Sequence, residues 1–315
     1  AKGIVKREVT RVVTPGTVIE DAILESKKNN FLAGIFPKGE TIGLALLDLS
    51  TGLFQGESLK GESALIDSLR VAGPIECVVP EGAFESGVLK AVFSALPDMR
   101  PTKCENWTFD YDVAQDSLVR HFGVKSLEGF GCEGSADIVG AAGGIVHYVK
   151  EQLRHKLGHV RTFRVRSSSG SLVLDEATCV NLSLVPGRGG NTTPTLLGIL
   201  DSTKTAMGGR ELRDWVLRPL CRLDEITARH DAVEYLVKNR SLLGELREVL
   251  GGIRDLERAV ARAGSGVGSA RDIKSIGLSL GLVPQTRDLV AGTKAGMLSS
   301  LASSMELQPD IVALV

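Results

Sequence analysis

Hydrophobic and polar positions alternate in short blocks along the first third of the chain. Three apolar runs lie close together, separated by brief polar or glycine-containing breaks, at 31–36, 43–49 and 53–56. Runs of this length and spacing predict adjacent antiparallel strands. The patterns that follow predict a helix, a buried strand closed by Pro80, and a second helix, at 62–71, 75–79 and 86–96.

This order of three strands, a helix, a strand and a helix predicts a layered α/β domain of the RNase H-like class. Between 97 and 109 the pattern lapses, because two prolines and mixed polar residues interrupt it. We interpret that stretch as a linker. The first domain is therefore expected at 1–107 and a second domain at 108–315.

The second domain is predicted to be mainly α-helical. Apolar residues recur at i, i+3 and i+4 from Ile138 to Leu153, as on a helix with one buried face. A strand-like insert is expected at 162–165 and 172–174, with its turn at 167–171, and a glycine-rich turn at 186–191. Further helices are predicted at 207–217, 226–237 (with Asp224 as its N-cap), 241–249, 255–263 and 270–282.

Composition narrows the class of protein but not its activity. The 315 residues are 43% hydrophobic and 24% charged, with a formal net charge of −1, so the chain as a whole is not a basic nucleic-acid binder. The five cysteines never form a C-x-x-C pair, which favours a reduced cytoplasmic protein. The longest apolar stretch, 138–149, is too short for a membrane span. Because the chain begins without Met and ends on the apolar run 311–315, we expect truncation at both ends.

Two local patterns suggest small-ligand chemistry and are better explained otherwise. The glycines at 264, 266 and 268 fit no phosphate-binding loop and lie between predicted helices, which favours a flexible connection. His155 and His159 are spaced i, i+4 on a predicted helix end, as two metal ligands would be. No third ligand and no zincin glutamate accompany them, so no metal site is expected.

Asp48 is the one acidic residue whose position suggests catalysis. It lies late in a predicted strand, where RNase H-like nucleases place a metal-binding carboxylate. A two-metal nuclease needs several converging carboxylates, and the strand at 75–79 offers only Glu76. A structural role in ordering the turn at 48–52 is favoured, and a nuclease centred on Asp48 remains the alternative function.

The stretch 150–166 is the most basic part of the chain. It carries six Lys and Arg residues against Glu151, and its candidates for contact with DNA or with another domain are Lys150, Arg154, Lys156, Arg161 and Arg164. Only Phe163 could offer a stacking platform for bases. A solvated face or an interdomain contact is favoured over a DNA groove, because charge runs usually stay hydrated.

Ordered phrases along the whole chain resemble the DNA mismatch repair MutS family. They include the segment 7–17, N-N-F-L at 29–32, D-L-S-T-G at 48–52, G-F-G at 129–131, L-D-x-A-T-x-x-N-L at 174–182, M-G-x-R at 207–210, and D-L-E-R at 255–258. The residues that carry the structural signature are Asp175, Thr178, Asn181, Thr205, Gly208, Arg210, Trp215, Pro219, Asp255 and Arg258. Spacing also lets Asp255 pair with Arg258, and Arg254 with Glu257, across one helical turn. Ser183 departs from the family, which usually has an acidic residue after Asn-Leu, and so do Cys179 and Val180, which stand where basic residues are common.

The resemblance implies a connector domain followed by the first part of the helical core, or lever. It also implies that the chain has no catalytic, cofactor-binding or metal-binding residues of its own, whereas the full-length family protein binds ATP and Mg²⁺ in a domain outside this sequence. Implied partners are mismatched double-stranded DNA, MutL through the connector, and a second copy in a full-length homodimer, with the piece itself monomeric. The implied location is the bacterial cytoplasm, in association with the nucleoid and without contact with a membrane.

Overall fold

The computed structural model describes residues 9–166, 170–186 and 194–315. Contacts divide these residues into two compact units. Unit 1 contains the described residues up to Leu24, together with 30–166 and 264–266. Unit 2 contains 25–29, the described residues from 170 to 263, and 267–315. The short segment 25–29 therefore belongs by its contacts to unit 2, although both of its sequence neighbours belong to unit 1.

Unit 1 is built on a six-stranded mixed sheet with the order β5-β4-β1-β2-β3-β6. Its strands are β1 (Phe31–Lys38), β2 (Thr41–Asp48), β3 (Leu53–Lys60), β4 (Glu76–Pro80), β5 (Arg100–Cys104) and β6 (Arg164–Val165). The first three strands are antiparallel, whereas β4, β5 and β6 add in parallel. This arrangement confirms the predicted α/β domain. β5, at one edge, carries Arg100, Pro101 and Lys103.

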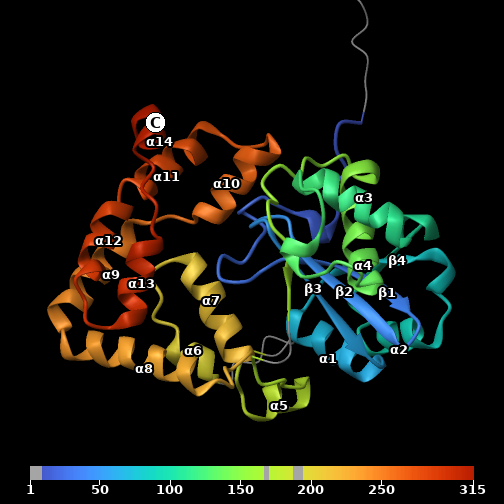
Figure 1. Ribbon diagram of the computed structural model, residues 1–315, viewed down its shortest axis with the longest axis horizontal. Coiled ribbons are helices and arrows are strands. Elements are labelled where there is room, and N and C mark those ends of the chain that lie inside the picture. The colour runs from blue at the N-terminus through green and yellow to red at the C-terminus, as the bar shows by residue number, and fades with distance from the viewer. Residues whose placement is uncertain (1–8, 167–169, 187–193) are drawn as a thin grey trace, which may run out of the picture. The chain divides into compact units, whose positions relative to one another are not determined.

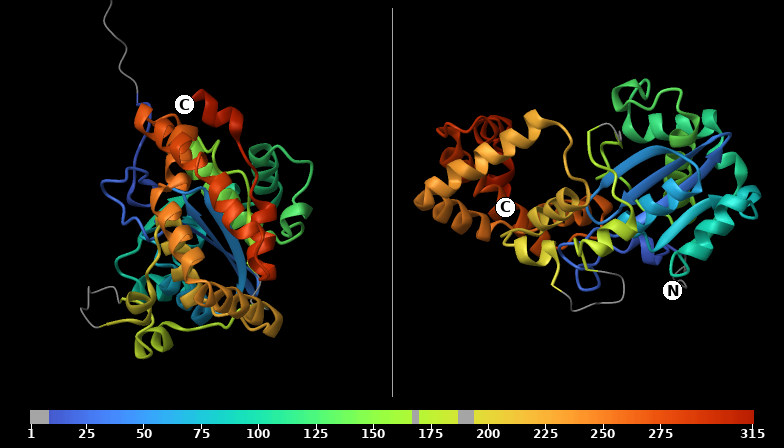
Figure 2. Two further views of the ribbon diagram at one scale, coloured as in Figure 1. Left: turned by 90° about the vertical axis from the view of Figure 1, so that its left-hand side faces the viewer. Right: turned by 90° about the horizontal axis from the view of Figure 1, so that it is seen from below.

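Helices cover both faces of this sheet (Figures 1 and 2). α1 (Glu62–Ala72) and α2 (Gly87–Ala95) pack on one face, and α4 (Ala136–His147) packs on the other, with α3 (Tyr111–Phe122) against α4. Alternating strand residues divide between the two faces: Leu32 packs toward α4, and Ala33 and Ile35 toward α1 and α2. The result is an apolar layer on each side of the sheet.

Glycines let α4 lie unusually close to the strands. A Cβ on Gly43 would lie 1.9 Å from the backbone oxygen of Asp137, and one on Gly34 would lie 2.5 Å from the oxygen of Ala141. Both contacts are far shorter than van der Waals distance, so only glycine fits at these strand positions. The glycines at positions 34 and 43 of the predicted strands are thus explained by the close approach of helix and sheet.

The predicted boundary after Trp107 is wrong. The stretch that lacked a clear pattern contains β5, which pairs with β4 over five residues, and the turn η3 (Asn106–Phe109). α3 and α4 follow and supply much of the core on one face of the sheet, so unit 1 extends to Arg166. The strand expected at 162–165 is two residues long and joins this sheet through β3.

Unit 2 is helical. Its helices are α5 (Glu176–Asn181), α6 (Leu196–Leu200), α7 (Ala206–Leu217), α8 (Leu223–Lys238), α9 (Arg240–Gly252), α10 (Leu256–Ser265, whose last two residues belong to unit 1), α11 (Ala270–Leu280), α12 (Val283–Ala291), α13 (Gly296–Ser304) and α14 (Pro309–Leu314). α8, α9, α12 and α13 pack together around Ala232, Val290 and Leu298. The main helical region is confirmed, and α5, α6 and α12 to α14 were not among the predicted helices.

Several local predictions need correction. The strand expected at 172–174 is absent from the described residues, where only an isolated bridge joins Ser171 to Leu220. The N-cap of α8 is Arg222, and Asp224 lies in the first turn and pairs with it. The turn at 167–171 and the glycines at 187–190 fall largely outside the described residues. No helix in the described parts of the chain is long and apolar enough to cross a bilayer.

Candidate functional site

The predicted signature residues of α7 and α10 meet in unit 2. α7 begins at Thr205, whose Oγ1 accepts a hydrogen bond from the amide of Gly208 at 3.0 Å. This cap satisfies one of the unpaired amides at the helix start. It also fixes the first turn, from which Arg210 extends toward Asp255 at the start of α10.

Arg210 is buried, with 5% of its side chain exposed, and its guanidinium has four hydrogen bonds. Nη1 and Nη2 donate to the two oxygens of Asp255 at 2.8 Å each, and Nη2 donates to Glu257 at 2.7 Å. Nη1 also donates to the backbone oxygen of Ser26 at 2.7 Å. The planar fork of arginine is suited to this combination of a bidentate carboxylate and a carbonyl.

Arg258 holds the same short segment from α10. Its side chain is 2% exposed, and Nη2 donates to the backbone oxygens of Glu25 at 3.0 Å and Lys28 at 2.8 Å. The amide of Lys28 donates in turn to the oxygen of Glu25 at 3.2 Å, which closes a tight turn. Two buried guanidinium groups therefore bind backbone carbonyls of segment 25–29.

A third contact comes from the segment's own side chain. Lys27 Nζ donates to both oxygens of Asp201, at 2.9 and 2.8 Å, and the same carboxylate accepts from the amide of Thr203 at 3.0 Å. The stem of Lys27 lies against α7, where a Cβ on Gly209 would come within 2.6 Å of it. We call Lys27, Asp201, Arg210, Asp255 and Arg258, with the segment they hold, the arginine clasp.

Electrostatics in the clasp favour the charged forms. Burial opposes ionisation of Arg210, but its hydrogen bonds to Asp255 and Glu257 and their charges outweigh this and raise its pKa. Burial likewise opposes ionisation of Asp255, and Arg210 and then Arg258 lower the pKa of that carboxyl below its usual value. The Arg210–Asp255 pair therefore remains charged at neutral pH.

The pairings predicted from helix spacing are largely replaced by longer-range ones. Arg258 Nε lies 3.8 Å from Asp255, whose main partner is Arg210. Glu257 also pairs with Arg210, and Arg254 instead uses its amide to donate to Ser279 Oγ at 3.0 Å. Lys27 and the three backbone carbonyls were missed, because a carbonyl acceptor has no signature in sequence.

The remaining signature residues have local structural contacts. Asp175 caps α5 by accepting from the amide of Thr178 at 2.6 Å, and Asn181 ends that helix. Trp215 lies later on α7, with the guanidinium of Arg229 from α8 centred 3.6 Å from its ring. The backbone oxygen of Pro219 accepts from the amide of Leu172 at 2.7 Å.

Asp48 has the geometry of a structural carboxylate. It is fully buried, and it accepts from the amides of Asn30 at 3.2 Å and Ser50 at 2.9 Å and from Ser50 Oγ at 2.7 Å. Glu76 is equally occupied, by Gly16 N at 2.9 Å and Tyr148 Oη at 2.7 Å. The described residues contain no group of three or more acidic, histidine or cysteine side chains arranged to hold a metal ion. The geometry of Asp48 gives no support to the nuclease alternative.

His155 and His159 are not on a helix. α4 ends in a single π-helical turn, η5 (Tyr148–Gln152), and the chain beyond it is irregular. His155 Nε2 lies 2.7 Å from the oxygen of Val12, and His159 Nε2 lies 2.9 Å from the oxygen of Leu49. Each ring is thus engaged with a different backbone carbonyl, and the spacing that suggested two ligands on one helix face does not apply.

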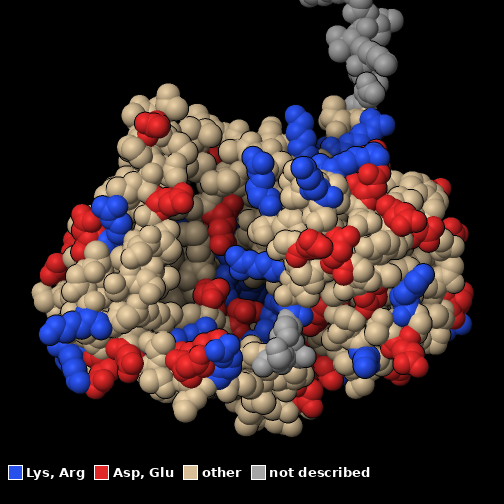
Figure 3. Space-filling view, in the orientation of Figure 1, with Lys and Arg blue, Asp and Glu red and all other residues tan. Residues whose placement is uncertain are grey.

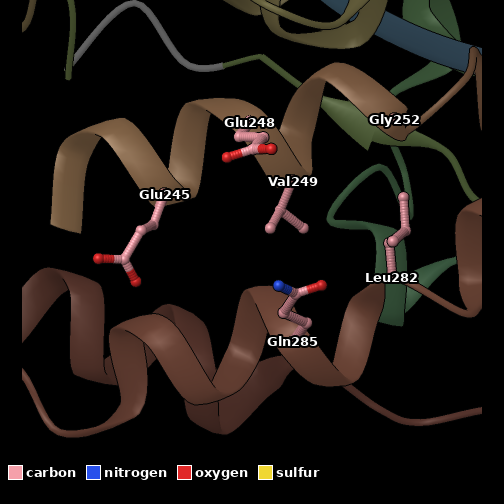
Figure 4. A pocket seen from close by; sticks show the side chains of 6 residues that line it. All are labelled: Glu245, Glu248, Val249, Gly252, Leu282 and Gln285. Atoms are coloured by element: carbon pink, nitrogen blue, oxygen red, sulfur yellow. The ribbon is translucent and has the colours of Figure 1, made fainter. Parts of the chain in front are cut away.

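An open cavity in unit 2 lies between α9 and α12 and has a volume of about 340 Å³. Figure 4 shows its lining residues, Glu245, Glu248, Val249, Gly252, Leu282 and Gln285. Two carboxylates and an amide are its polar groups, and none of the clasp residues faces it. We assign it no ligand.

Comparison with known proteins follows the same division of the chain. Family models match it as MutS domain II over residues 30–161 and as MutS domain III over residues 177–313. The chain belongs to the MutS family. The first match ends close to the end of unit 1, in agreement with the contacts and not with a boundary at Trp107.

Three relatives illustrate the extent of the similarity. The DNA mismatch repair proteins MutS of Symbiobacterium thermophilum, Myxococcus xanthus and Protochlamydia amoebophila are 39%, 35% and 32% identical to the chain. The alignments cover 99–100% of this chain but only 35–37% of those proteins. The chain therefore spans little more than a third of the length of these MutS relatives.

Proposed function

We propose that this chain is the connector and the first part of the lever of a mismatch repair protein, and that it relays between DNA and an ATPase without catalysis of its own. In this proposal the full-length protein binds mismatched double-stranded DNA as a homodimer in the bacterial cytoplasm, on the nucleoid. ATP and Mg²⁺ act outside this chain, and the connector docks MutL. Membership of the MutS family and the matches to domains II and III support this role.

The arginine clasp is the observation that carries the proposal. Its guanidinium groups hold backbone atoms of segment 25–29. This segment leads directly into Asn30 and β1. Asn30 is fixed in its turn, because its amide donates to Asp48 and its side chain to the oxygen of Pro15 at 3.0 Å. A displacement of α7 or α10 would therefore be transmitted along the backbone to the first strand of the sheet.

The energetics suit a relay. Hydrogen bonds from buried, charged donors to carbonyls are stronger than neutral ones, at roughly 1.5–3 kcal/mol each, so the segment should move with the helices rather than slip past them. Asp255 orients the Arg210 side chain through paired hydrogen bonds, and it accepts from the backbone amide of Arg258 at 3.3 Å, which positions the first turn that carries Arg258. Both grips therefore depend on one carboxylate.

The test replaces each clasp arginine by lysine in the intact protein that contains this chain. Lysine keeps the charge but cannot bind a carboxylate and a carbonyl in the same fork geometry. We expect Arg210→Lys and Arg258→Lys to bind mismatched duplex within about twofold of the wild type, whereas ATP-induced release from the mismatch slows by about tenfold, an activation barrier higher by about 1.4 kcal/mol. Recruitment of MutL should fall in parallel.

The matched control is Arg222→Lys, because Arg222 is an exposed arginine whose ion pairs in the described part of the chain are with Asp224 and Glu225. It should leave release and recruitment unchanged. Thermal unfolding of each variant separates a lost relay from a lost fold. Release at the wild-type rate in both clasp variants would show that the clasp is structural only.

A further inference from the structure

The basic segment of unit 1, residues 150–164, carries several cations without an ion pair among the residues that the structure describes. Lys150, Lys156, Arg161 and Arg164 form no ion pair within the described residues. Some other surface cations are neutralised: Lys90 pairs with Glu85 at 3.0 Å, for example. Unneutralised like charges on one segment repel each other, so they are stabilised by an anionic partner.

The fold exposes Lys156, Arg161 and Arg164, whereas Lys150 is half-buried. Leu153, Leu157, Val160 and Phe163 are buried in the core of unit 1, and the charged residues between them are exposed. Figure 3 shows Lys and Arg side chains gathered on the upper part of unit 1, where the segment after α4 runs in Figure 1. An anchored backbone lowers the entropy lost when the side chains bind.

The positive charge of the segment affects a histidine on a neighbouring helix. His121, on α3, has a pKa lowered to about 4, first by burial and then by the nearby charges of Lys150, His159 and Arg161. The segment therefore sets up a positive potential that reaches a neighbouring helix.

The character of the surface identifies its partner. The exposed residues of the segment are charged, polar or glycine, without the exposed aromatic and aliphatic anchors typical of protein interfaces. Phe163 is only 3% exposed and packs edge-on against Phe54 with ring centroids 4.8 Å apart, so it offers no platform for unstacked bases. Cations without base-stacking groups suit the phosphate backbone of a duplex.

We propose that segment 150–164 is a sequence-independent contact surface for the phosphates of double-stranded DNA, with the exposed residues Lys156, Arg161 and Arg164 as its contacts. The proposal rests on the function proposed above and adds a DNA contact within the connector itself. It requires the exposed side chains of this segment and none of the clasp residues.

The test compares two triple variants of the 315-residue chain. Lys156→Gln, Arg161→Gln and Arg164→Gln together remove three contacts. Lys90→Gln, Arg222→Gln and Lys238→Gln remove the same charge from exposed cations that pair with acidic residues. Anisotropy of a fluorescein-labelled homoduplex is measured over a range of KCl concentrations, with thermal unfolding as a check on the fold.

We expect the segment variant to bind duplex about tenfold more weakly at low salt, with the slope of log K against log[KCl] shallower by about 2 to 3. The control should stay within about twofold of the wild type. Equal weakening in both variants, an unchanged segment variant, tighter binding of single-stranded than of duplex DNA, or no duplex binding by the wild type would each overturn the proposal. These outcomes are separate from failure of the relay, which is measured as ATP-induced release in the clasp variants.

Discussion

The two units are held together by different kinds of interaction. Unit 1 has an apolar layer on each face of its sheet, and many of its core residues, such as Leu44 and Phe109, are completely buried. The apolar cluster of unit 2 is small, and its five buried members keep 3–8% exposure. Around it, unit 2 relies on the arginine clasp, on helix caps and on paired charges such as Arg262 with Asp272.

This difference indicates how the two units respond to force and to substitution. A close-packed apolar core resists small displacements, because every shift opens cavities or creates overlaps. Helices joined at a few polar points can be moved as a group while those points hold. Unit 1 therefore has the character of a rigid body, and unit 2 that of an assembly of helices that is set by a few contacts.

The largest expected effect comes from truncating a side chain in the apolar core of unit 1. Phe109→Ala in unit 1 should cost about 3–5 kcal/mol, because Phe109 is fully buried against Phe36 and α4. Leu298→Ala in unit 2 should cost only about 2 kcal/mol, because Leu298 retains 8% exposure in a looser cluster.

Each unit carries one tryptophan, Trp107 in unit 1 and Trp215 in unit 2, which gives a separate signal for each. Urea unfolding followed by fluorescence in Trp107→Phe and Trp215→Phe backgrounds measures the two losses independently. Equal losses in the two units would remove the distinction between them.

We expect acid to destabilise unit 1 at a higher pH than unit 2. The folded-state pKa of His121 is lowered to about 4, and those of His155 and His159 are also lowered, in each case chiefly by burial. A histidine whose pKa is lowered by folding stays neutral in the folded state while the unfolded state takes up a proton. The free energy of unfolding therefore falls as pH drops from the unfolded value near 6.5 toward 4. We expect unit 1 to lose on the order of 1–2 kcal/mol in that window, after allowance for solvent screening.

Unit 2 should respond at lower pH. Although burial acts in the other direction, hydrogen bonds and charge from their arginine partners lower the pKa of Asp255, and that of Asp272 to about 2. Their contribution is present above the unfolded value near 4 and is lost as pH falls toward 2. Trp215 fluorescence that changes before Trp107 fluorescence during acid titration would contradict this order.

The smallest effect tests helix caps, which both units use. Thr205→Ala should cost about 1 kcal/mol, because Thr205 Oγ1 caps α7 at 3.0 Å, and the loss should appear only in the signal of Trp215. Ser86→Ala should cost about 0.5 kcal/mol in unit 1, since the Ser86 hydrogen bond to the amide of Leu89 is longer, at 3.3 Å. A cap loss that spreads to the signal of the other unit would show that the two units unfold together.

Local patterns in the sequence predicted most of the strands and helices, because each has its own periodicity. They did not predict the extent of unit 1. β5 contains a proline and has mostly exposed or half-exposed residues, so it lacks a strand pattern and looks like a linker. The apolar stripe from Ile138 to Leu153 was recognised, but its helix ends in a π-helical turn at Tyr148, whose hydroxyl hydrogen bonds with Glu76.

The clasp was predictable only in its parts. The resemblance to the family marked Arg210, Asp255 and Arg258 as signature residues without giving them partners. Those partners lie far away in the chain: Arg210 binds a carbonyl 184 residues before it and a carboxylate 45 residues after it. Helix spacing favours pairs one turn apart, whereas Asp255 and Glu257 pair mainly with Arg210, which is distant in sequence and comes near only when α7 and α10 pack.

The edge strand β5 has a consequence for association. An exposed edge usually offers a row of amides and carbonyls on which another chain can extend the sheet. β5 resists this, because Pro101 lacks an amide proton and Arg100 and Lys103 place charge beside it. Strand-by-strand recruitment of a partner, and the edge-to-edge aggregation that follows the same route, are thereby disfavoured on this side of unit 1. A protein that docks here must recognise side chains.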